Sequence, residues 1–176
     1  MCTGGLETYK LKVGYKWMND VMVEQGGQMK KISGNLCEAF DEKKDGKIIG
    51  KLLAIGVGIN INRSQEALNL IDQTATSMLG ASKSDVKFSV ADILEGYSRM
   101  LLSNLQALYQ NGFDSSYGYI SSHLLYKGKP VKIFDLDNLD SVIAEGTLED
   151  IDSQYGFLKI SGHDSLIMNG RLRLSM

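Results

Sequence analysis

The segment IIGKLLAIGVGINI, residues 48–61, restricts the fold most strongly, because it is the most apolar run in the sequence. Its mixture of Val and Ile with Gly favours a β-strand over a helix, and a near-continuous apolar run is typical of a central strand. Gly56 and Gly58 lie two residues apart, so both fall on one face of that strand, where another group can approach the backbone closely. No third glycine follows, so the pair does not open a dinucleotide-binding fingerprint. Close packing of another element explains the pair as well as a ligand does.

A β-hairpin is predicted upstream of this strand. Residues 11–23 read as a strand interrupted at 18–20, and the QGGQ turn that follows suits glycines with positive φ. Residues 30–40 then predict the returning strand. Its buried face is expected to hold three residues: Ile32, Leu36 and Phe40.

Helices are predicted in the middle of the chain. Residues 64–80 start with a potential N-cap, Ser64, and stop at Gly80. Residues 89–112 predict the clearest helix, and 115–126 a short one beside it. Apolar residues recur at helical spacing in the longest segment and are expected to be core: Val90, Ile93, Leu94, Tyr97, Met100, Leu101, Leu105 and Leu108.

The sequence changes character at Lys127. Short strand-like segments separated by glycines follow, and Pro130 opens the first, where its missing N–H does little harm. This spacing is typical of a small antiparallel barrel. We therefore predict two domains, residues 1–126 and 127–176, with the second leaning on the first for stability.

Composition excludes several classes of function. Nineteen Lys and Arg against 21 Asp and Glu leave a net charge of −2, which argues against a nucleic-acid partner. No run is long enough for a membrane span and no secretory leader is recognisable, so we expect a cytoplasmic protein. Cys2 and Cys37 suit reduced thiols, with Cys37 a small buried filler, and His123 and His163 lack neighbouring metal ligands.

Polar residues flank the predicted hairpin and can form a ligand site. Asn19 and Asp20 at the strand break offer an amide and a carboxylate, and Lys31 on the returning strand offers a compact cation. Asn60 adds a second amide at the end of the apolar strand. This set suits a phosphorylated small molecule, although Asn, Asp and Gly are also the commonest turn formers, and the turn interpretation is the stronger one on these residues alone.

Five segments in order resemble the biotin protein ligase family: KWMND, KKISGNL, AIGVGININ, TATSML, and the C-terminal pattern from KPVKIF to MNGRLRL. The resemblance covers the chain from about Leu11 to Ser175. It implies an α/β (α+β) catalytic domain with a mixed sheet, followed by a small SH3-like β-barrel. It also implies the reaction: biotin and ATP, with Mg²⁺, give biotinyl-5′-adenylate, and the biotinyl group passes to a lysine of a carboxylase's biotin carrier domain.

The same resemblance implies roles for single residues. Lys31, rather than Lys30, corresponds to the family's catalytic lysine and would neutralise charge at the α-phosphate. Asp20 would orient Lys31 or accept a proton from the acceptor lysine. The substrate-binding residues are then Asn19, Lys31, Gly34, Gly56, Gly58 and Asn60, with Thr76 and Ser77 near the adenosine. Trp17 is expected to be a core residue that anchors the Asn-Asp turn.

The sequence departs from the family in three places. Met18 replaces the usual proline, and Asp20 and Lys31 are further apart than usual. The family's Gly-Arg-rich loop, which folds over biotin and the phosphates, has no counterpart upstream of Trp17. We therefore expect the N-terminal half of the catalytic domain to be missing, and biotin binding and transfer to be impaired.

Two alternatives to a biotin ligase remain at this point. The first is a non-catalytic remnant that acts as a carrier-binding or dimerisation module, because an exposed sheet edge would favour a homodimer. The second is the related lipoate ligase chemistry, in which the lysine of KKISG also occurs. A repressor role has no support, because no helix-turn-helix precedes the domain.

Overall fold

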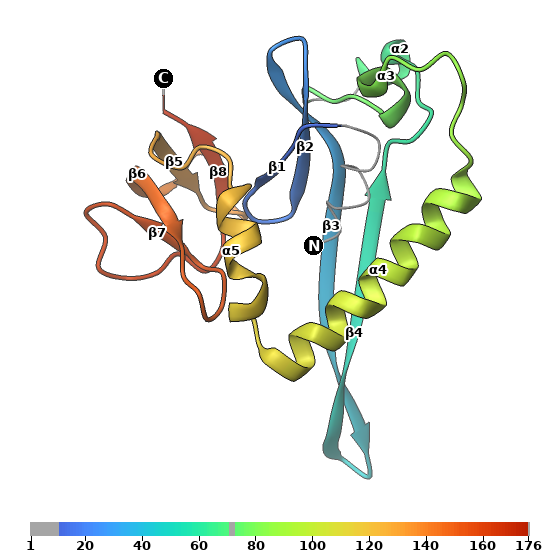
Figure 1. Cartoon of the computed structure of the whole chain (residues 1–176). Helices are drawn as coiled ribbons and strands as arrows, with labels where there is room; N and C mark the ends of the chain where they lie inside the picture. The colour runs from blue at the N-terminus through green and yellow to red at the C-terminus, as the bar shows by residue number, and fades with distance from the viewer. Residues whose placement is uncertain (1–10, 71–72, 176) are drawn as a thin grey trace.

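The computed structural model describes residues 11–70 and 73–175, and two antiparallel four-stranded sheets organise this part of the chain (Figure 1). The first, the N-terminal sheet, has the order β1-β2-β3-β4, and the second, the C-terminal sheet, has the order β7-β6-β5-β8. The helices come between them in sequence. The predicted α/β class is confirmed, whereas the strand pairs are all antiparallel and the parallel pairing among described residues is limited to isolated bridges.

The N-terminal sheet is built from two consecutive hairpins. Its strands are β1 (Val13–Lys16), β2 (Asp20–Gln25), β3 (Gln28–Lys44) and β4 (Lys47–Ile59). Gly26 and Gly27 take φ values of 62° and 77° in the predicted β2–β3 turn, which L side chains rarely adopt. The break before Asp20 is also confirmed. Apolar side chains of β2 and β3, Val21, Val23 and Ile32, form one buried core with Leu11 and Met78.

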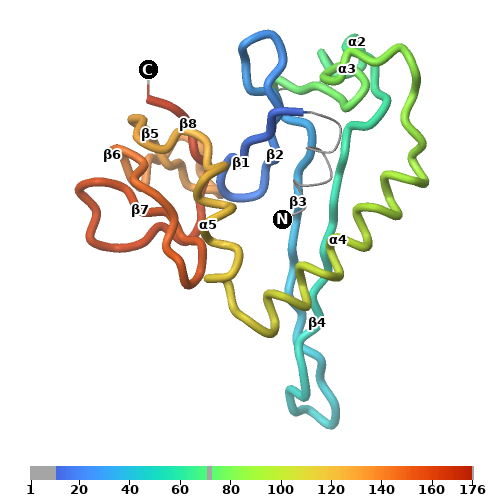
Figure 2. The backbone as a smooth tube through the Cα atoms, viewed as in Figure 1, coloured from blue at the N-terminus to red at the C-terminus, as the bar shows by residue number. Residues whose placement is uncertain are grey.

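The β3–β4 hairpin extends well beyond the rest of the molecule (Figure 2). Leu36 and Phe40 are therefore 62% and 52% exposed, so the prediction that they share the buried face of Ile32 is wrong. β4 is the last strand of the described sheet rather than a central one, and Cys37 is exposed rather than a buried filler. A strand has buried faces only where other elements cover it, and the described residues cover neither face of this outer half.

Four helices follow in the described chain: α2 (Gln65–Leu68), α3 (Met78–Ser82), α4 (Val90–Asn111) and α5 (Asp114–Ser122). Ser64 caps α2 as predicted, but the single helix expected over 64–80 is wrong. It is replaced by two short helices, with Gly80 inside α3, because Ser77 caps a new helix there with its side chain. Gly112 ends α4 with a φ of 71°, as predicted.

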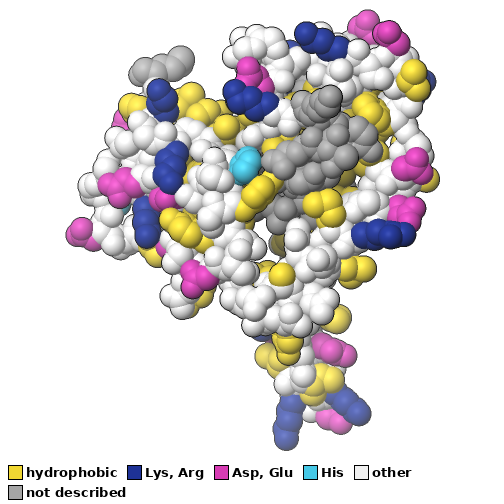
Figure 3. Space-filling model, in the orientation of Figure 1, with side chains coloured by type: hydrophobic (Ala, Val, Ile, Leu, Met, Phe, Trp, Pro, Cys, Tyr) yellow, Lys and Arg dark blue, Asp and Glu magenta, His cyan; other side chains and the backbone are white. Residues whose placement is uncertain are grey.

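The apolar stripe of α4 is not a buried core. No residue of α4 is buried, and Val90, Leu94 and Leu108 are 57%, 62% and 43% exposed. Hydrophobic side chains are visible along this helix and along the projecting hairpin (Figure 3). The periodicity predicted the helix correctly, but it could not say whether a partner element covers the stripe.

The C-terminal sheet contains β5 (Pro130–Phe134), β6 (Val142–Ile151), β7 (Leu158–Ile160) and β8 (Arg171–Leu174). Pro130 opens β5, as predicted. The strand pairs β6–β7, β5–β6 and β5–β8 are antiparallel. Within the described residues β7 and β8 are not paired with each other, so the sheet is open and the predicted closed barrel is not observed.

One hydrophobic core joins the two sheets. Tyr15 and Trp17 belong to the N-terminal sheet and its following turn, yet they pack with Val131, Leu148 and Leu158 of the C-terminal sheet. Helix α5 adds Ile120 to the same cluster. Trp17 is only 4% exposed, which confirms it as a core residue. No helix among the described residues is long and apolar enough to cross a membrane.

Asp152 organises the β6–β7 turn that meets Trp17. Its carboxylate accepts hydrogen bonds from three backbone N–H groups, those of Gln154 (2.9 Å), Tyr155 (2.8 Å) and Phe157 (2.6 Å). Burial would raise the pKa of Asp152, but these hydrogen bonds outweigh it and lower the pKa below the ordinary 3.8. The same turn places the Gly156 carbonyl 3.1 Å from the indole Nε1 of Trp17.

We predict that Asp152→Ala lowers the free energy of unfolding by about 2 kcal/mol, because three part-buried backbone N–H donors lose their acceptor. Since the folded pKa is depressed, the contribution of Asp152 is present above the unfolded pKa of 3.8 and disappears as pH falls through the folded value. Urea unfolding of both proteins between pH 7 and pH 3 checks this. A deficit that stays constant over the whole pH range would contradict it.

Candidate functional site

An ion pair between β2 and β3 lies at the centre of the site. The Lys31 Nζ is 2.6 Å from the Asp20 Oδ1, and the two side chains are 24% and 18% exposed. A close pair that is mostly shielded from water is less screened than a surface pair, so the two charges fix each other's position. The structure thus brings together two of the residues that the sequence proposed.

A β-bulge in β3 puts Lys31 on the face of Asp20. Asp20 pairs with Gly34, and side chains three residues apart on a regular strand point to opposite faces. The register shifts between Val21 and Met22, so that Ile32 is the extra residue of β3. One inserted residue reverses the alternation, and Lys31 therefore pairs with Met22 on the same face as Asp20.

Gly34 leaves room for the lysine side chain. A Cβ at this position would lie 3.1 Å from both Cε and Nζ of Lys31 and 3.5 Å from Asp20 Oδ1. A methyl group there would force the end of the Lys31 side chain to shift by a few tenths of an ångström. The glycine is thus explained by a close approach of a side chain rather than by a turn.

An open groove of about 360 Å³ lies beside this pair. Four of the proposed site residues line it: Lys31, Gly34, Gly58 and Asn60. Gly34 and Gly58 are paired across β3 and β4, so this part of the groove wall is bare backbone. A volume above roughly 300 Å³ is in the range of small-molecule sites.

Sequence reasoning missed part of this groove. Arg63 and Gln73 also line it, and the segment containing Ala75 runs along β3. The N–H of Lys31 donates to the Thr74 carbonyl (3.0 Å). Pairing between segments more than forty residues apart leaves no local signal in the sequence. Arg63, however, lies two residues after the apolar run, and its charge could have been noted.

Asn60 is held by its backbone, which leaves its side chain at the groove. Its N–H donates to the Ile32 carbonyl at 2.9 Å, and its carbonyl accepts from Met78 at 2.8 Å. Ser77 has a structural role, because its hydroxyl caps α3 and donates to the Arg63 carbonyl at 2.8 Å. Thr76 is fully buried, and its Oγ1 has no hydrogen-bond partner among the residues that the structure describes.

Asn19 and Gly56 are not among the residues that line the groove. The amide of Asn19 donates to the Asn35 carbonyl (2.7 Å), and the Asn35 N–H donates back to the Asn19 carbonyl (3.0 Å). Asn19 therefore fastens the turn before Asp20 to β3. Gly56 lies opposite Leu36, further out along the hairpin.

Further positive charges surround the ion pair. Lys16 is directly opposite Asp20 in the β1–β2 register. Burial lowers the pKa of Lys16 below that of an exposed lysine, and the Asp20 carboxylate opposes this shift. Three other cations lower the same pKa: Arg171, Lys31 and Arg173. Two of them come from β8, so the C-terminal sheet contributes to the electrostatics of this site.

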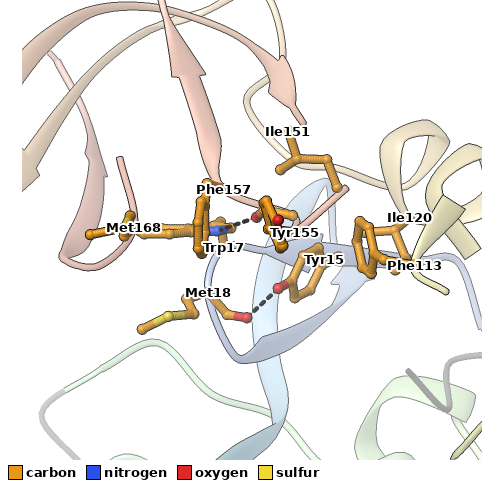
Figure 4. Close-up of a pocket in the computed structure, with 10 residues that line it drawn as sticks. Tyr15, Trp17, Met18, Phe113, Ile120, Ile151, Tyr155, Phe157 and Met168 are labelled. Atoms are coloured by element: carbon orange, nitrogen blue, oxygen red, sulfur yellow. Dashed lines mark hydrogen bonds between the residues drawn. The ribbon is translucent and has the colours of Figure 1, made fainter. Parts of the chain in front are cut away.

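The turn between β1 and β2 is anchored from the other side. Trp17 donates from Nε1 to the Gly156 carbonyl, and the Tyr15 hydroxyl donates to the Met18 carbonyl (Figure 4). The Trp17–Met18 peptide bond is cis. Both ends of the turn are thus held, by the core on one side and by Asn35 on the other.

Among the described residues, no group of three or more His, Cys, Asp or Glu side chains gathers as metal ligands.

No protein-family model matches the sequence, and neither does any curated protein. Solved structures do match. The biotin protein ligase of Aquifex aeolicus in complex with biotin and ATP is 26% identical with a TM-score of 0.72, covering 98% of this chain and 67% of that one. A point mutant of that enzyme in complex with biotin is 27% identical with a TM-score of 0.74, and the match again covers 98% of this chain and 67% of that one. A biotin protein ligase-like protein of unknown function from Silicibacter is 13% identical with a TM-score of 0.62, and the match covers 94% of this chain and 68% of that one.

The chain therefore has a biotin protein ligase-like fold and spans about two thirds of the length of these neighbours. The resemblance on which the sequence argument depended is confirmed at the level of the fold. The neighbour structures contain biotin and ATP, or biotin alone. The roles of single residues in this chain remain predictions.

We predict that Thr76→Val raises the free energy of unfolding by about 1 kcal/mol, because burying a hydroxyl without a partner costs more than burying a methyl group. Thr76→Ala serves as the control, since it removes the hydroxyl together with packing volume. Thermal and urea unfolding of the three proteins provide the measurement. A clear loss of stability in Thr76→Val would mean that Oγ1 is hydrogen-bonded in solution.

Proposed function

We propose that a chain with this fold activates biotin with ATP and transfers the biotinyl group to a lysine of a biotin carrier domain. The observation that carries the proposal is the shielded Asp20–Lys31 pair, 2.6 Å apart, at a groove walled by the bare backbone of Gly34 and Gly58. A fixed cation beside accessible backbone suits a reaction in which negative charge accumulates on phosphate oxygens. The ligase neighbours with biotin and ATP support the same direction.

In the first step, a biotin carboxylate oxygen attacks the α-phosphorus of ATP, and the bond to the β-phosphate oxygen breaks. The products are biotinyl-5′-adenylate and pyrophosphate. Two anions must approach each other, so a cation at the point of attack lowers the barrier most. We assign this cation to Lys31, whose position is fixed by Asp20 before substrate arrives.

In the second step, the acceptor lysine's neutral amine attacks the acyl carbon of the mixed anhydride, and AMP leaves with the bonding electron pair. The attacking nitrogen gives up one proton. Asp20 is the carboxylate nearest to Lys31 and is the candidate acceptor for this proton. Before substrates bind, Asp20 would orient Lys31 through the ion pair between them.

The other site residues receive positioning roles. Asn60 would donate its side-chain amide to a phosphate oxygen, and Gly58 would let the biotin tail lie against β4. Asn19 would act through the turn, because its amide already binds the Asn35 carbonyl. Gly56 would extend the bare backbone track along the strand, outside the groove itself.

Mg²⁺ would enter together with ATP. This ion keeps several waters and is usually held by one or two carboxylates plus the substrate's phosphates. The Asp20 carboxylate, which pairs with Lys31, could supply one oxygen ligand to such an ion beside the substrate's phosphates. Bound there, the ion would supply further neutralisation of phosphate charge.

We also propose the domain division at residue 126, with a catalytic part followed by an SH3-like C-terminal part. The shared core around Trp17 explains why the second part would lean on the first.

A second candidate function is a binding or dimerisation module without catalysis. The observation that favours it is the projecting hairpin, where Ile48, Leu52 and Leu53 are 59%, 57% and 57% exposed. Exposed apolar strands of this length favour association with another chain. This function would not require Lys31, whereas the ligase function does.

We predict that Lys31→Ala lowers the rate of biotin-dependent pyrophosphate–ATP exchange by roughly 10²–10³-fold, the usual loss when one charge-stabilising group is removed. Lys30→Ala is the matched control, because Lys30 pairs with Val23 and lies on the opposite face of the sheet from Lys31. The control should exchange at the rate of the unchanged protein. Equal loss in both variants, or no exchange in any folded form, would contradict the proposal.

A second prediction concerns Gly34. The added methyl of Gly34→Ala would lie 3.1 Å from Lys31 Nζ and displace it from Asp20, so exchange should fall by at least tenfold while unfolding stability changes little. Gly118→Ala is the control, since a Cβ there meets no atom within 4 Å. Unchanged exchange in Gly34→Ala would show that the ion-pair geometry is not required.

A further inference from the structure

A second pocket, of about 200 Å³, lies where the turn before Asp20 meets the C-terminal sheet. Trp17 and Met18 of the turn form one side, and Tyr155, Phe157 and Met168 of the C-terminal sheet's loops form the other (Figure 4). Neither the ion pair nor the groove beside it involves these residues.

The lining of this pocket has the chemistry of a protein contact. Tyr155 and Met168 are 61% and 63% exposed, and Met18 is 38% exposed, so apolar surface is open to solvent around a buried tryptophan. Tyrosine, methionine and tryptophan are enriched in interface cores, where they surround single anchoring side chains. The volume is below the roughly 300 Å³ of typical small-molecule pockets, which suits one side chain rather than a nucleotide.

The pocket is also close to the proposed reaction centre. Trp17 and Met18 precede Asn19 and Asp20 directly, and three residues span at most roughly 11 Å. A side chain that enters the pocket therefore places its own polypeptide within about three residues' reach of Asp20. An acceptor lysine has to arrive at that position.

Positive charge borders the same region. Lys16 precedes Trp17, and Arg171 follows Met168 by three residues at the start of β8. Arg171 and Arg173 alternate with the buried Leu172, so both point out of the C-terminal sheet, and their charges reach Lys16. Such a row of cations attracts an acidic protein surface and speeds its encounter.

We infer that this pocket, the Trp17 pocket, is the docking site of the acceptor protein: it receives an apolar side chain next to the target lysine, from a surface rich in Asp and Glu. The inference rests on the proposed function for the identity of the partner. It goes beyond that function by assigning acceptor recognition to four residues that do not line the groove beside Lys31: Tyr155, Met168, Arg171 and Arg173.

The single tryptophan of the chain gives a direct test, because Trp17 lines the pocket. A biotin carrier domain that contains no tryptophan is titrated into the full chain, and the fluorescence of Trp17 is followed. Occupancy of the pocket should change the emission saturably. Met168→Glu and Tyr155→Ala should each weaken this binding by about tenfold, the usual effect of losing a contact at an interface centre.

Charge reversal tests the acidic partner. Arg171→Glu combined with Arg173→Glu should weaken binding at low salt, with a difference that shrinks as salt rises. The matched control for charge reversal is Lys43→Glu combined with Lys44→Glu at the end of the β3–β4 hairpin. The control for Tyr155→Ala is Tyr109→Ala on α4, since Tyr109 is 93% exposed. Both controls should bind like the unchanged chain.

The outcomes separate this inference from the proposed function. Pyrophosphate–ATP exchange reports adenylate formation alone and should be unchanged in Met168→Glu, whereas transfer from added biotinyl-5′-adenylate to the carrier should fall by about tenfold. Failure of exchange with intact binding would refute the ligase function and leave the docking site standing. No response of Trp17, or equal binding by all variants, would refute the docking site.

Discussion

The one-residue bulge at Ile32 is the constraint on which the candidate site depends. Without it, Lys31 would point to the opposite face of the sheet from Asp20, and no ion pair would form. With it, Ile32 enters the core while Lys31 faces the groove, so a single irregularity serves both packing and chemistry. Gly34 then provides the space in which the ammonium sits.

The two sheets cooperate through the turn that precedes Asp20. Trp17 is buried in a core formed mainly by the C-terminal sheet, and its indole is hydrogen-bonded to Gly156. The position of Asp20 therefore depends on elements more than a hundred residues away. This coupling gives the C-terminal sheet a part in the site that goes beyond stability, since its arginines also influence Lys16.

Much of this arrangement follows from local patterns in the sequence. The QGGQ turn, the Ser64 cap and the long helix ending at Gly112 could all be predicted, because turn and cap residues act within a few positions. The residues alone placed Asp20 and Lys31 around one hairpin, but their direct pairing was expected only from the family resemblance, because the bulge that creates it leaves no mark in residue spacing. The same applies to Arg63 and Gln73, which reach the groove by pairing distant in sequence.

The failed predictions share one physical cause. The stripe of α4, the outer half of β3 and Cys37 were all assigned to a core because they are apolar, yet none of them is buried among the described residues. Periodicity reveals which face of an element is apolar, whereas burial depends on whether a partner covers that face. Closure of the expected small barrel is likewise not observed among the described residues, since strand spacing predicts strands but not closure.

The most direct test of the account is intact-mass analysis of a biotin carrier domain after incubation with the purified chain, biotin and ATP. We predict a mass increase equal to one biotinyl group, which requires ATP, persists with Lys30→Ala and disappears with Lys31→Ala. A carrier domain that stays unmodified by the folded chain, or that is modified equally by Lys31→Ala, would contradict it.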